Sequence, residues 1–202
     1  MYHTVMGKIK NWIWGALVLC CASAGAQTKV YEMSVLGFKF GKMIVNRTLQ
    51  SDSSEVYTLN ASGKATVLWM DFVSQTKQEV VYKKGRLVSS SYQEIENGKV
   101  KRWTKVRYDG THYQVDSYKG QRSFTEAPLF SIANLYFDGF KTIQQIFYEA
   151  EGEFTKVHTN GKDRLEISTS EGNRSVYHFL NGEVTNMEFY LAIAVVYMKR
   201  IA

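Results

Sequence analysis

Cysteine is scarce in this chain of 202 residues, and its two copies stand together as Cys20 and Cys21 near the amino terminus. Both fall within a stretch that we expect to be removed by proteolysis, for the reasons given below. The remaining chain would then carry no thiol. Disulfide bonds, thiolate metal sites and cysteine nucleophiles are excluded on that basis.

Catalytic and nucleotide-binding motifs are also missing. The chain has no G-x-S-x-G elbow, no G-x-x-x-x-G-K-[ST] loop and no dinucleotide fingerprint, so serine-hydrolase and nucleotide-dependent activities have no support. His112, His158 and His178 lie on separate predicted strands without metal-ligand spacing. No arginine-rich run or aromatic-basic motif indicates nucleic acid. We therefore expect no catalytic residue, no metal, no cofactor and no nucleic-acid partner.

A hydrophobic run near the amino terminus, Trp12–Ala22, is too short to span a bilayer. Lys8 and Lys10 precede this run and Ala24-Gly25-Ala26 follows it, which is the pattern of a secretory signal peptide. We expect residues 1–26 to be that signal and residues 27–202 to form a single exported domain. Its location would be the periplasm or cell envelope of a Gram-negative bacterium.

A lipid anchor is the alternative outcome at this signal. A bacterial lipoprotein signal has a small residue directly before its cysteine, whereas Leu19 precedes Cys20 here. The pattern therefore favours ordinary cleavage, and the exported chain is not expected to be transmembrane.

Losing Lys8 and Lys10 would lower the formal charge from +6 to +4. Because acidic and basic residues alternate along the predicted strands, we interpret them as a solvated face.

The residues that are abundant indicate β-structure. Alternating apolar and polar positions recur between dipeptides such as Asn97-Gly98, Asp109-Gly110 and Asn181-Gly182, which suit tight hairpin turns. The turns follow one another at intervals of about 8–12 residues, as in a meander. The predicted strands are Val30–Leu36, Lys42–Gln50, Glu55–Ala61, Thr66–Val73, Gln78–Lys83, Arg86–Glu96, Lys99–Tyr108, Thr111–Tyr118, Thr142–Glu149, Glu153–Thr159, Asp163–Thr169, Arg174–Leu180, Glu183–Phe189 and Tyr190–Arg200.

These strands predict an all-β fold: a curved antiparallel meander that forms a half-barrel or open barrel. The last strand could be helical, but its β-branched centre favours a strand. One short helix or corner is expected near residues 129–136, after Pro128, the only proline. It could close one end of the sheet, although we favour a simpler role in which Phe130, Leu135 and Phe137 fill the core.

The central hairpins fix an expected register. A two-residue loop at Asn97-Gly98 would place Glu96 opposite Lys99, Glu94 opposite Lys101 and Tyr92 opposite Trp103. A similar loop at Asp109-Gly110 would place Val106 opposite Tyr113, Thr104 opposite Val115 and Trp103 opposite Asp116. Alternation then puts Leu87, Ser89 and Ser91 on the core face together with Thr104, Val106, Tyr108, Tyr113 and Val115.

That face is rich in small and hydroxylated residues, which leaves room for a ligand. One hypothesis is a concave wall that binds an apolar or amphipathic molecule such as a lipid or lipoprotein chain; a thin polar edge of the core is an equally good explanation. The candidate ligand-binding residues are Ser89, Ser91, Arg102, Thr104, Tyr108 and Tyr113.

Two other functions remain open. The opposite face could contact an envelope protein partner; its candidate residues are Lys101, Trp103, Lys105 and Arg107. A glycan-processing hydrolase would need a carboxylate pair. Glu149, Glu151 and Glu153 form an acidic cluster, but we interpret them as charged turn residues.

Four segments carry a resemblance that spans nearly the whole exported chain: Tyr31–Lys42, Tyr82–Leu87, Ser131–Phe137 and Tyr177–Gly182. They resemble an exported all-β family of unknown function from Gram-negative bacteria. More remotely, the chain is similar to the curved half-barrels of periplasmic lipoprotein carriers. The shared motifs are hairpin glycines and aromatic residues, so the resemblance implies a fold and carries no catalytic residue.

Overall fold

The computed structural model describes residues 25–67, 70–139, 143–161, 163–191 and 194–202. The expected signal peptide and its cysteines lie outside these residues, apart from Gly25 and Ala26. The amino-terminal half contains eight strands, most of them long. They are β1 (Ala26–Val35), β2 (Phe38–Leu49), β3 (Ser54–Val67), β4 (Met70–Lys83), β5 (Arg86–Glu96), β6 (Lys99–Tyr108), β7 (Tyr113–Ser117) and β8 (Gly120–Phe124).

The carboxy-terminal half contains one helix and six shorter strands. They are α1 (Ile132–Asp138), β9 (Gln145–Tyr148), β10 (Glu153–Thr159), β11 (Arg164–Ser168), β12 (Arg174–Leu180), β13 (Glu183–Tyr190) and β14 (Val195–Arg200). The prediction of a strand near the carboxy terminus is therefore confirmed over Val195–Arg200. The short helix near residues 129–136 is also confirmed, displaced by about three residues.

All fourteen strands belong to one antiparallel sheet in the order β8-β7-β6-β5-β4-β3-β2-β1-β14-β13-β12-β11-β10-β9. The chain runs outward from β1 to β8, then resumes at β9 and returns to β14, which pairs with β1. The sheet is open, because β8 and β9 are edges that do not pair with each other. It is thus the unclosed, barrel-like meander that the sequence predicts.

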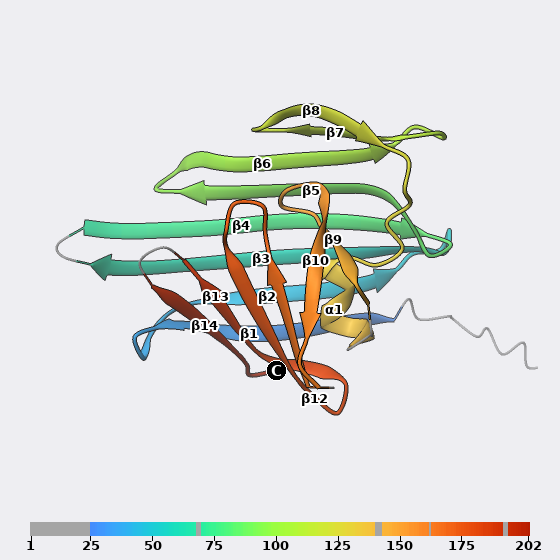
Figure 1. Cartoon of the computed structure of the whole chain (residues 1–202). Helices are drawn as coiled ribbons and strands as arrows, with labels where there is room; N and C mark the ends of the chain where they lie inside the picture. Colours follow the sequence, from blue (N-terminus) through green and yellow to red (C-terminus); the bar gives the residue numbers. More distant parts are fainter. Residues whose placement is uncertain (1–24, 68–69, 140–142, 162, 192–193) are drawn as a thin grey trace, which may run out of the picture.

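Figure 1 shows how this sheet fills space. Strands β1 to β8 form a broad slab, and β9 to β14 fold over one face of it, with their strands crossing those of the slab steeply. Helix α1 contacts β3, β9 and β13 and so lies between the two layers. Leu135 is 0% exposed in the core, while Phe130 and Phe137 pack against it. The helix therefore fills the core, as expected.

Two β-bulges, in β5 and β6, set which side chains of these strands face inward. Val81 pairs with Ser89 and Tyr82 with Leu87, which leaves Val88 unpaired. Because a bulge reverses the alternation, Ser90 becomes buried beyond it and Ser91 is exposed. The expectation that Ser89 and Ser91 share the core face of Leu87 is therefore wrong.

The second bulge lies at Lys101, because Ile95 pairs with Val100 and Glu94 pairs with Arg102. Glu96 does face Lys99, but the expected pairs of Glu94 with Lys101 and Tyr92 with Trp103 do not form. Their true partners are Arg102 and Thr104.

The next hairpin also differs in register, since its loop has four residues rather than two. The Asp109 carboxylate accepts hydrogen bonds from the amides of Thr111 (2.9 Å) and His112 (2.8 Å), which stabilises the longer turn. None of the three pairs expected for this hairpin forms, and other pairs take their place. They are Tyr108 with Tyr113, Val106 with Val115, Lys105 with Asp116 and Thr104 with Ser117.

Glycines 41 and 63 lie within strands, although the strands predicted from the sequence left both of them in connecting segments. β3 runs through Ser62-Gly63-Lys64 without a break, and Gly41 pairs with Gly63. A Cβ at Gly63 would come within 2.5 Å of the Phe40 ring, and one at Gly41 would lie 2.6 Å from the Gly63 Cα. These glycines therefore allow the Phe40 ring to lie across the sheet.

Candidate functional site

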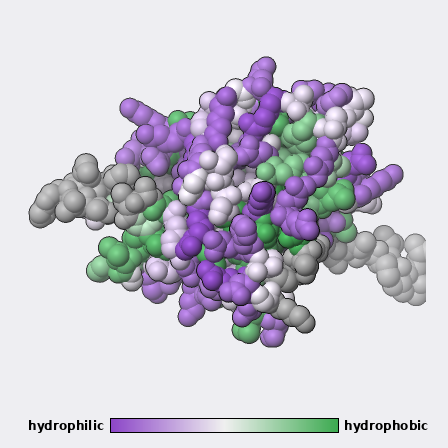
Figure 2. Space-filling view, in the orientation of Figure 1, coloured by the Kyte–Doolittle hydropathy of each residue, from purple (hydrophilic) through white to green (hydrophobic). Residues whose placement is uncertain are grey.

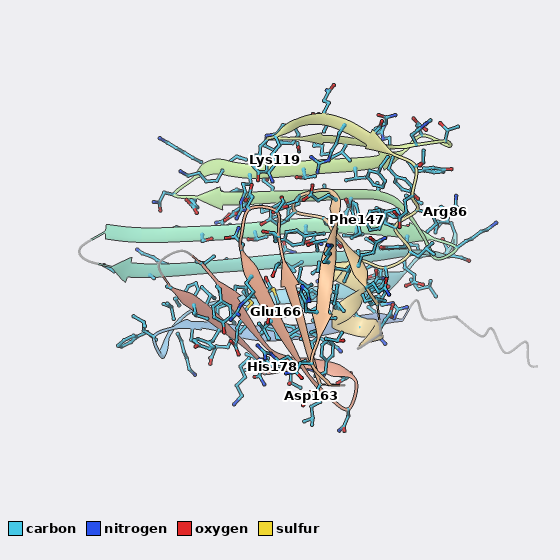
Figure 3. The ribbon with its side chains drawn as sticks, viewed as in Figure 1. Arg86, Lys119, Phe147, Asp163, Glu166 and His178 are labelled. Carbon is cyan, nitrogen blue, oxygen red and sulfur yellow. The ribbon has the colours of Figure 1, made fainter. Side chains whose placement is uncertain are left out.

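A cavity of about 220 Å³ lies between the slab and the layer of β9 to β14. Its wall is built from both layers and from α1, so it exists only because the sheet folds over itself. The apolar and aromatic residues among its lining are Met33, Phe40, Met43, Leu59, Ala61, Tyr92, Ile132, Tyr136, Tyr148, Ala150, Tyr177, Phe189, Tyr190, Leu191, Val196 and Met198. Phe147 of β9, labelled in Figure 3, is 0% exposed and belongs to the core.

One wall of the cavity is polar and comes from β5 and β6. The Arg102 Nε donates to Glu94 Oε2 at 2.7 Å, and the Tyr92 hydroxyl lies 3.4 Å from the same oxygen. Arg102 Nη1 also donates to Glu171 Oε2 at 3.0 Å. Burial alone would lower the pKa of Arg102, but its hydrogen bond with Glu94 raises it above its ordinary value. The guanidinium is thus held charged and paired with two carboxylates.

Glu171 lies in the turn between β11 and β12, so this ion pair joins the two layers. The Tyr118 hydroxyl donates to Glu171, and Lys119 Nζ lies 2.9 Å from its Oε1. These hydrogen bonds lower the pKa of Glu171. In Figure 3, Lys119 lies at the top of the slab. The charges near the cavity are therefore compensated within the protein.

Neutral hydrogen-bonding groups also face the cavity. Gln78 lines it, and the buried Gln78 Nε2 has no hydrogen-bond partner among the described residues. Burial raises the pKa of Tyr92, Tyr136, Tyr148 and Tyr177, which keeps their hydroxyls protonated at neutral pH. The site thus offers a largely apolar volume edged by uncharged donors and by the paired charges of Glu94, Arg102 and Arg174.

The six candidate ligand-binding residues divide between the two faces of the slab. Arg102 lines the cavity. Thr104 is buried and donates to the Ala150 carbonyl oxygen at 2.7 Å, while Tyr113 is 0% exposed and donates to the Leu87 carbonyl. Tyr108 stacks near the Tyr113 ring, with centroids 4.8 Å apart. Ser89 and Ser91, by contrast, belong to the outer face.

The four candidate interaction residues lie toward that outer face. Trp103 and Lys105 line an outer hollow of about 970 Å³, and Lys101 and Arg107 are exposed. The outer hollow is lined by Thr58, Asn60, Lys77, Gln78, Glu79, Ser91, Tyr92, Gln93, Val100, Trp103, Lys105 and Asp116. It is therefore a broad, mixed-charge depression.

The acidic cluster lies at a turn, as we interpreted it, but two of its carboxylates are buried. Glu149 and Glu151 are only 1% and 2% exposed. The Glu149 Oε1 accepts from the Ala133 amide at 3.0 Å, and Glu151 Oε2 accepts from the Ser170 hydroxyl at 2.7 Å. The turn that carries them packs inward against the slab, with Gly152 close to Thr104 and Val115. Neither carboxylate lines the cavity, and Glu94 is its single carboxylate among the described residues.

Sequence reasoning did not find Gln78, Glu94 or Tyr148 as cavity residues. Glu94 was missed because the bulge at Val88, which turns it toward the cavity, has no signal in the sequence. Tyr148 was missed because it reaches the cavity only when β9 to β14 fold over the slab. Within the described ranges, no group of three histidine, cysteine or acidic residues could hold a metal ion. The described part of the chain also contains no helix long and apolar enough to cross a bilayer.

Comparisons with known proteins place these features in a family. A crystal structure of a beta-barrel-like protein of domain of unknown function DUF1849 from Brucella abortus is similar, with a TM-score of 0.54 and 9% identity over 88% of this chain and 96% of that one. That likeness concerns the fold alone. No curated protein matches the sequence. A family model described as Domain of unknown function (DUF6134) matches residues 31–201, and the chain belongs to that family.

Proposed function

We propose that this protein is a non-catalytic binding module of the bacterial cell envelope that holds the apolar part of a lipid or lipoprotein chain. The observation that supports this proposal is the cavity between the two layers, with its apolar lining and its polar wall at Tyr92, Glu94 and Arg102. Export, which the amino-terminal sequence predicts, would bring the protein to compartments where acyl chains are available.

The size of the cavity limits the ligand. An apolar cavity of about 150 Å³ can hold benzene, whereas drug-sized ligands use pockets of about 300–1,000 Å³. At about 220 Å³, this cavity suits one slender chain segment rather than two acyl chains side by side. The partnerless Gln78 Nε2 would donate to a carbonyl oxygen of the ligand.

Native mass spectrometry with organic extraction tests the proposal on protein that begins at Gln27 and is purified from a bacterial periplasm. We expect a bound mass that extracts as lipid. Ala61→Trp places an indole in the cavity and should abolish that mass, whereas Ser62→Trp, on the exposed side of the same strand, should retain it. A folded wild-type protein that carries no lipid, and that takes up none from micelles, would contradict the proposal.

An envelope interaction module is the second candidate function. The observation that favours it is the outer hollow, where Trp103 is half-buried beside Lys105 and Asp116. Tryptophan within a polar surround is typical of contact sites between proteins. A clean apo mass in the same experiment would favour this candidate over the lipid-binding one.

A further inference from the structure

The hairpin between β1 and β2 ends in an apolar tip, which consists of Leu36, Gly37 and Phe38. Leu36 is 83% exposed and Phe38 is 76% exposed, the two highest values among the large hydrophobic residues described. Figure 2 shows the tip as a hydrophobic protrusion at the lower left of the molecule. Two large apolar side chains thus project into the surroundings of the protein.

The backbone of the apolar tip is unfavourable for leucine. Leu36 has φ +50° and Gly37 has φ +82°, the geometry of a tight hairpin turn. Turns at Lys84-Gly85, Asn97-Gly98 and Asn181-Gly182 share this geometry, and each begins with a polar residue. Leucine is disfavoured at positive φ, and at 83% exposure Leu36 gains little packing in return. A strained residue that does not stabilise its own fold points to a role outside that fold.

The ends of β13 and β14, which form a second hairpin, lie beside the apolar tip. Val35 of β1 pairs with both Phe38 of β2 and Val196 of β14, so the ends of the two hairpins are neighbours. In the second hairpin Leu191 is 50% exposed, and the sequence from Tyr190 to Met198 contains no charged residue. The apolar tip is therefore part of a wider apolar end of the molecule.

Basic residues lie directly behind the apolar tip. Lys39 follows Phe38 and its side chain is 72% exposed, and Lys42 is also exposed. Glu32, which lies 3.0 Å from Lys39 Nζ and opposite Lys42 in the ladder, is the only carboxylate of this hairpin. One positive charge therefore remains uncompensated within this end of the hairpin. Apolar side chains ahead of lysines match the acyl interior and anionic headgroups of a lipid surface.

We propose that the apolar tip inserts into the surface of an anionic lipid bilayer, with Lys39 and Lys42 at the level of the headgroups. A specific protein partner fits less well, because a stable protein interface buries about 1,000 Å² or more and a convex tip of three residues offers far less. Insertion into a fluid bilayer needs no complementary pocket. The proposal does not require that the cavity hold a ligand.

The location of the apolar tip also bears on the cavity. Phe40 and Leu191, which both line the cavity, lie within the two hairpins that carry the exposed apolar residues. The cavity would therefore approach the membrane at this end. Transfer of a lipid between the bilayer and the cavity follows only if the proposed function is correct.

Sedimentation with vesicles tests the docking proposal. Protein that begins at Gln27 is mixed with vesicles of phosphatidylethanolamine and phosphatidylglycerol, and separately with phosphatidylcholine vesicles. We expect binding to the anionic vesicles that weakens with salt. The double variant Leu36→Asn/Phe38→Ser should lower the partition coefficient at least about tenfold, because it removes the inserted apolar area. Asparagine tolerates positive φ, so this variant should keep its fold.

The matched control removes exposed leucines elsewhere on the surface. Leu129 and Leu180 are 67% and 64% exposed, and Leu129→Asn/Leu180→Ser should bind vesicles like the wild type. The proposal is overturned if the wild type stays in the supernatant with anionic vesicles, or if the tip variant sediments as the wild type does. Sedimentation measures docking to vesicles, whereas native mass spectrometry measures lipid in the cavity. A failure of docking is therefore distinguished from a failure of ligand binding.

Discussion

At the scale of single residues, Glu149 is the most unusual group. Its side chain is buried beneath α1, and its Oε2 has no hydrogen-bond partner among the described residues. Burial raises the pKa of the Glu149 carboxyl from its ordinary 4.5 to about 7, even though the hydrogen bond from the Ala133 amide acts to lower it. The folded protein therefore holds a proton here that the unfolded chain releases near pH 4.5.

This proton makes Glu149 a source of pH-dependent stability. Between about pH 4.5 and pH 7 the unfolded state binds fewer protons than the folded state, so the free energy of unfolding falls as pH rises. A shift of this size corresponds to about 3 kcal/mol in total. Glu149→Gln removes the ionisation, so its stability relative to the wild type should increase between pH 5 and pH 8. Urea unfolding at both pH values measures this difference.

Glu171→Gln provides a control of opposite sign. Hydrogen bonds from Tyr118 and Lys119 lower the pKa of Glu171, so its contribution to stability is present above its ordinary pKa and is lost at lower pH. The loss of stability in this variant should therefore shrink as the pH falls toward and below 4. A Glu149→Gln difference that stays constant with pH would contradict the assignment of Glu149.

At the scale of elements, the close pairing of β2 with β3 depends on Gly41. A Cβ there would overlap the Ser62 carbonyl oxygen and lie 2.6 Å from the Gly63 Cα. Both neighbours are backbone atoms, so they cannot yield by a change of rotamer. Gly41→Ala should therefore lower the free energy of unfolding by about 1–3 kcal/mol, as overpacking does. The midpoint of urea unfolding reports this change.

Ser62→Ala is the matched control for that substitution. Ser62 lies opposite Lys42 in the same ladder and is exposed, so the change should shift stability by about 0.5 kcal/mol or less. An equal effect of the two alanine substitutions would argue against the steric role of Gly41.

Most elements could be predicted from the sequence because their turns are encoded locally. Asn97-Gly98 and Asn181-Gly182 mark their hairpins correctly, since few residue pairs accept positive φ twice. The bulges at Val88 and Lys101 could not be predicted, because neither residue differs in type from an ordinary strand residue. Gly63 misled us for a related reason: a glycine needed for close approach looks the same in sequence as a glycine needed for a turn.

At the scale of the whole molecule, side-chain contacts connect the two layers of the open sheet. The Thr104 hydroxyl on β6 donates to the Ala150 carbonyl in the opposite layer, and an Arg122 nitrogen donates to the Glu151 carbonyl. The ring centroids of Phe124 on β8 and Phe147 on β9 are 5.7 Å apart. These contacts join the two sheet edges without backbone pairing.

Thr104→Val tests this closure. The substitution keeps the shape of the side chain but leaves the buried Ala150 carbonyl without its donor, which should cost about 1–3 kcal/mol of stability. The same change at Thr28, whose hydroxyl bonds to Asn46 in an exposed position, should cost well under 1 kcal/mol. Denaturant unfolding of both variants provides the measurement. Similar losses at the two sites would show that the contact between layers contributes little.

The candidate site was harder to predict than the strands, because it is a property of both layers. Alternation correctly placed Arg102 on the inner face of β6, but Tyr148 of β9 joins the same cavity only after the sheet folds over. Nothing in the local pattern of β9 to β14 indicates which face of β1 to β8 they cover. The sequence patterns that mark strands and hairpins carry no information about such long-range packing.

The pairing of β1 with β14 has a kinetic consequence. The amide of Val30 donates to the Ala202 carbonyl, so nearly the first and the last residues of the described sheet share a hydrogen bond. Among the described residues this contact closes a very long loop, which carries a large loop-closure entropy and raises the contact order. As the chain is synthesised, β1 leaves one edge unpaired until β14 has emerged. The sheet should therefore be completed only once β14 is available, and until then that edge is open to pairing with other chains.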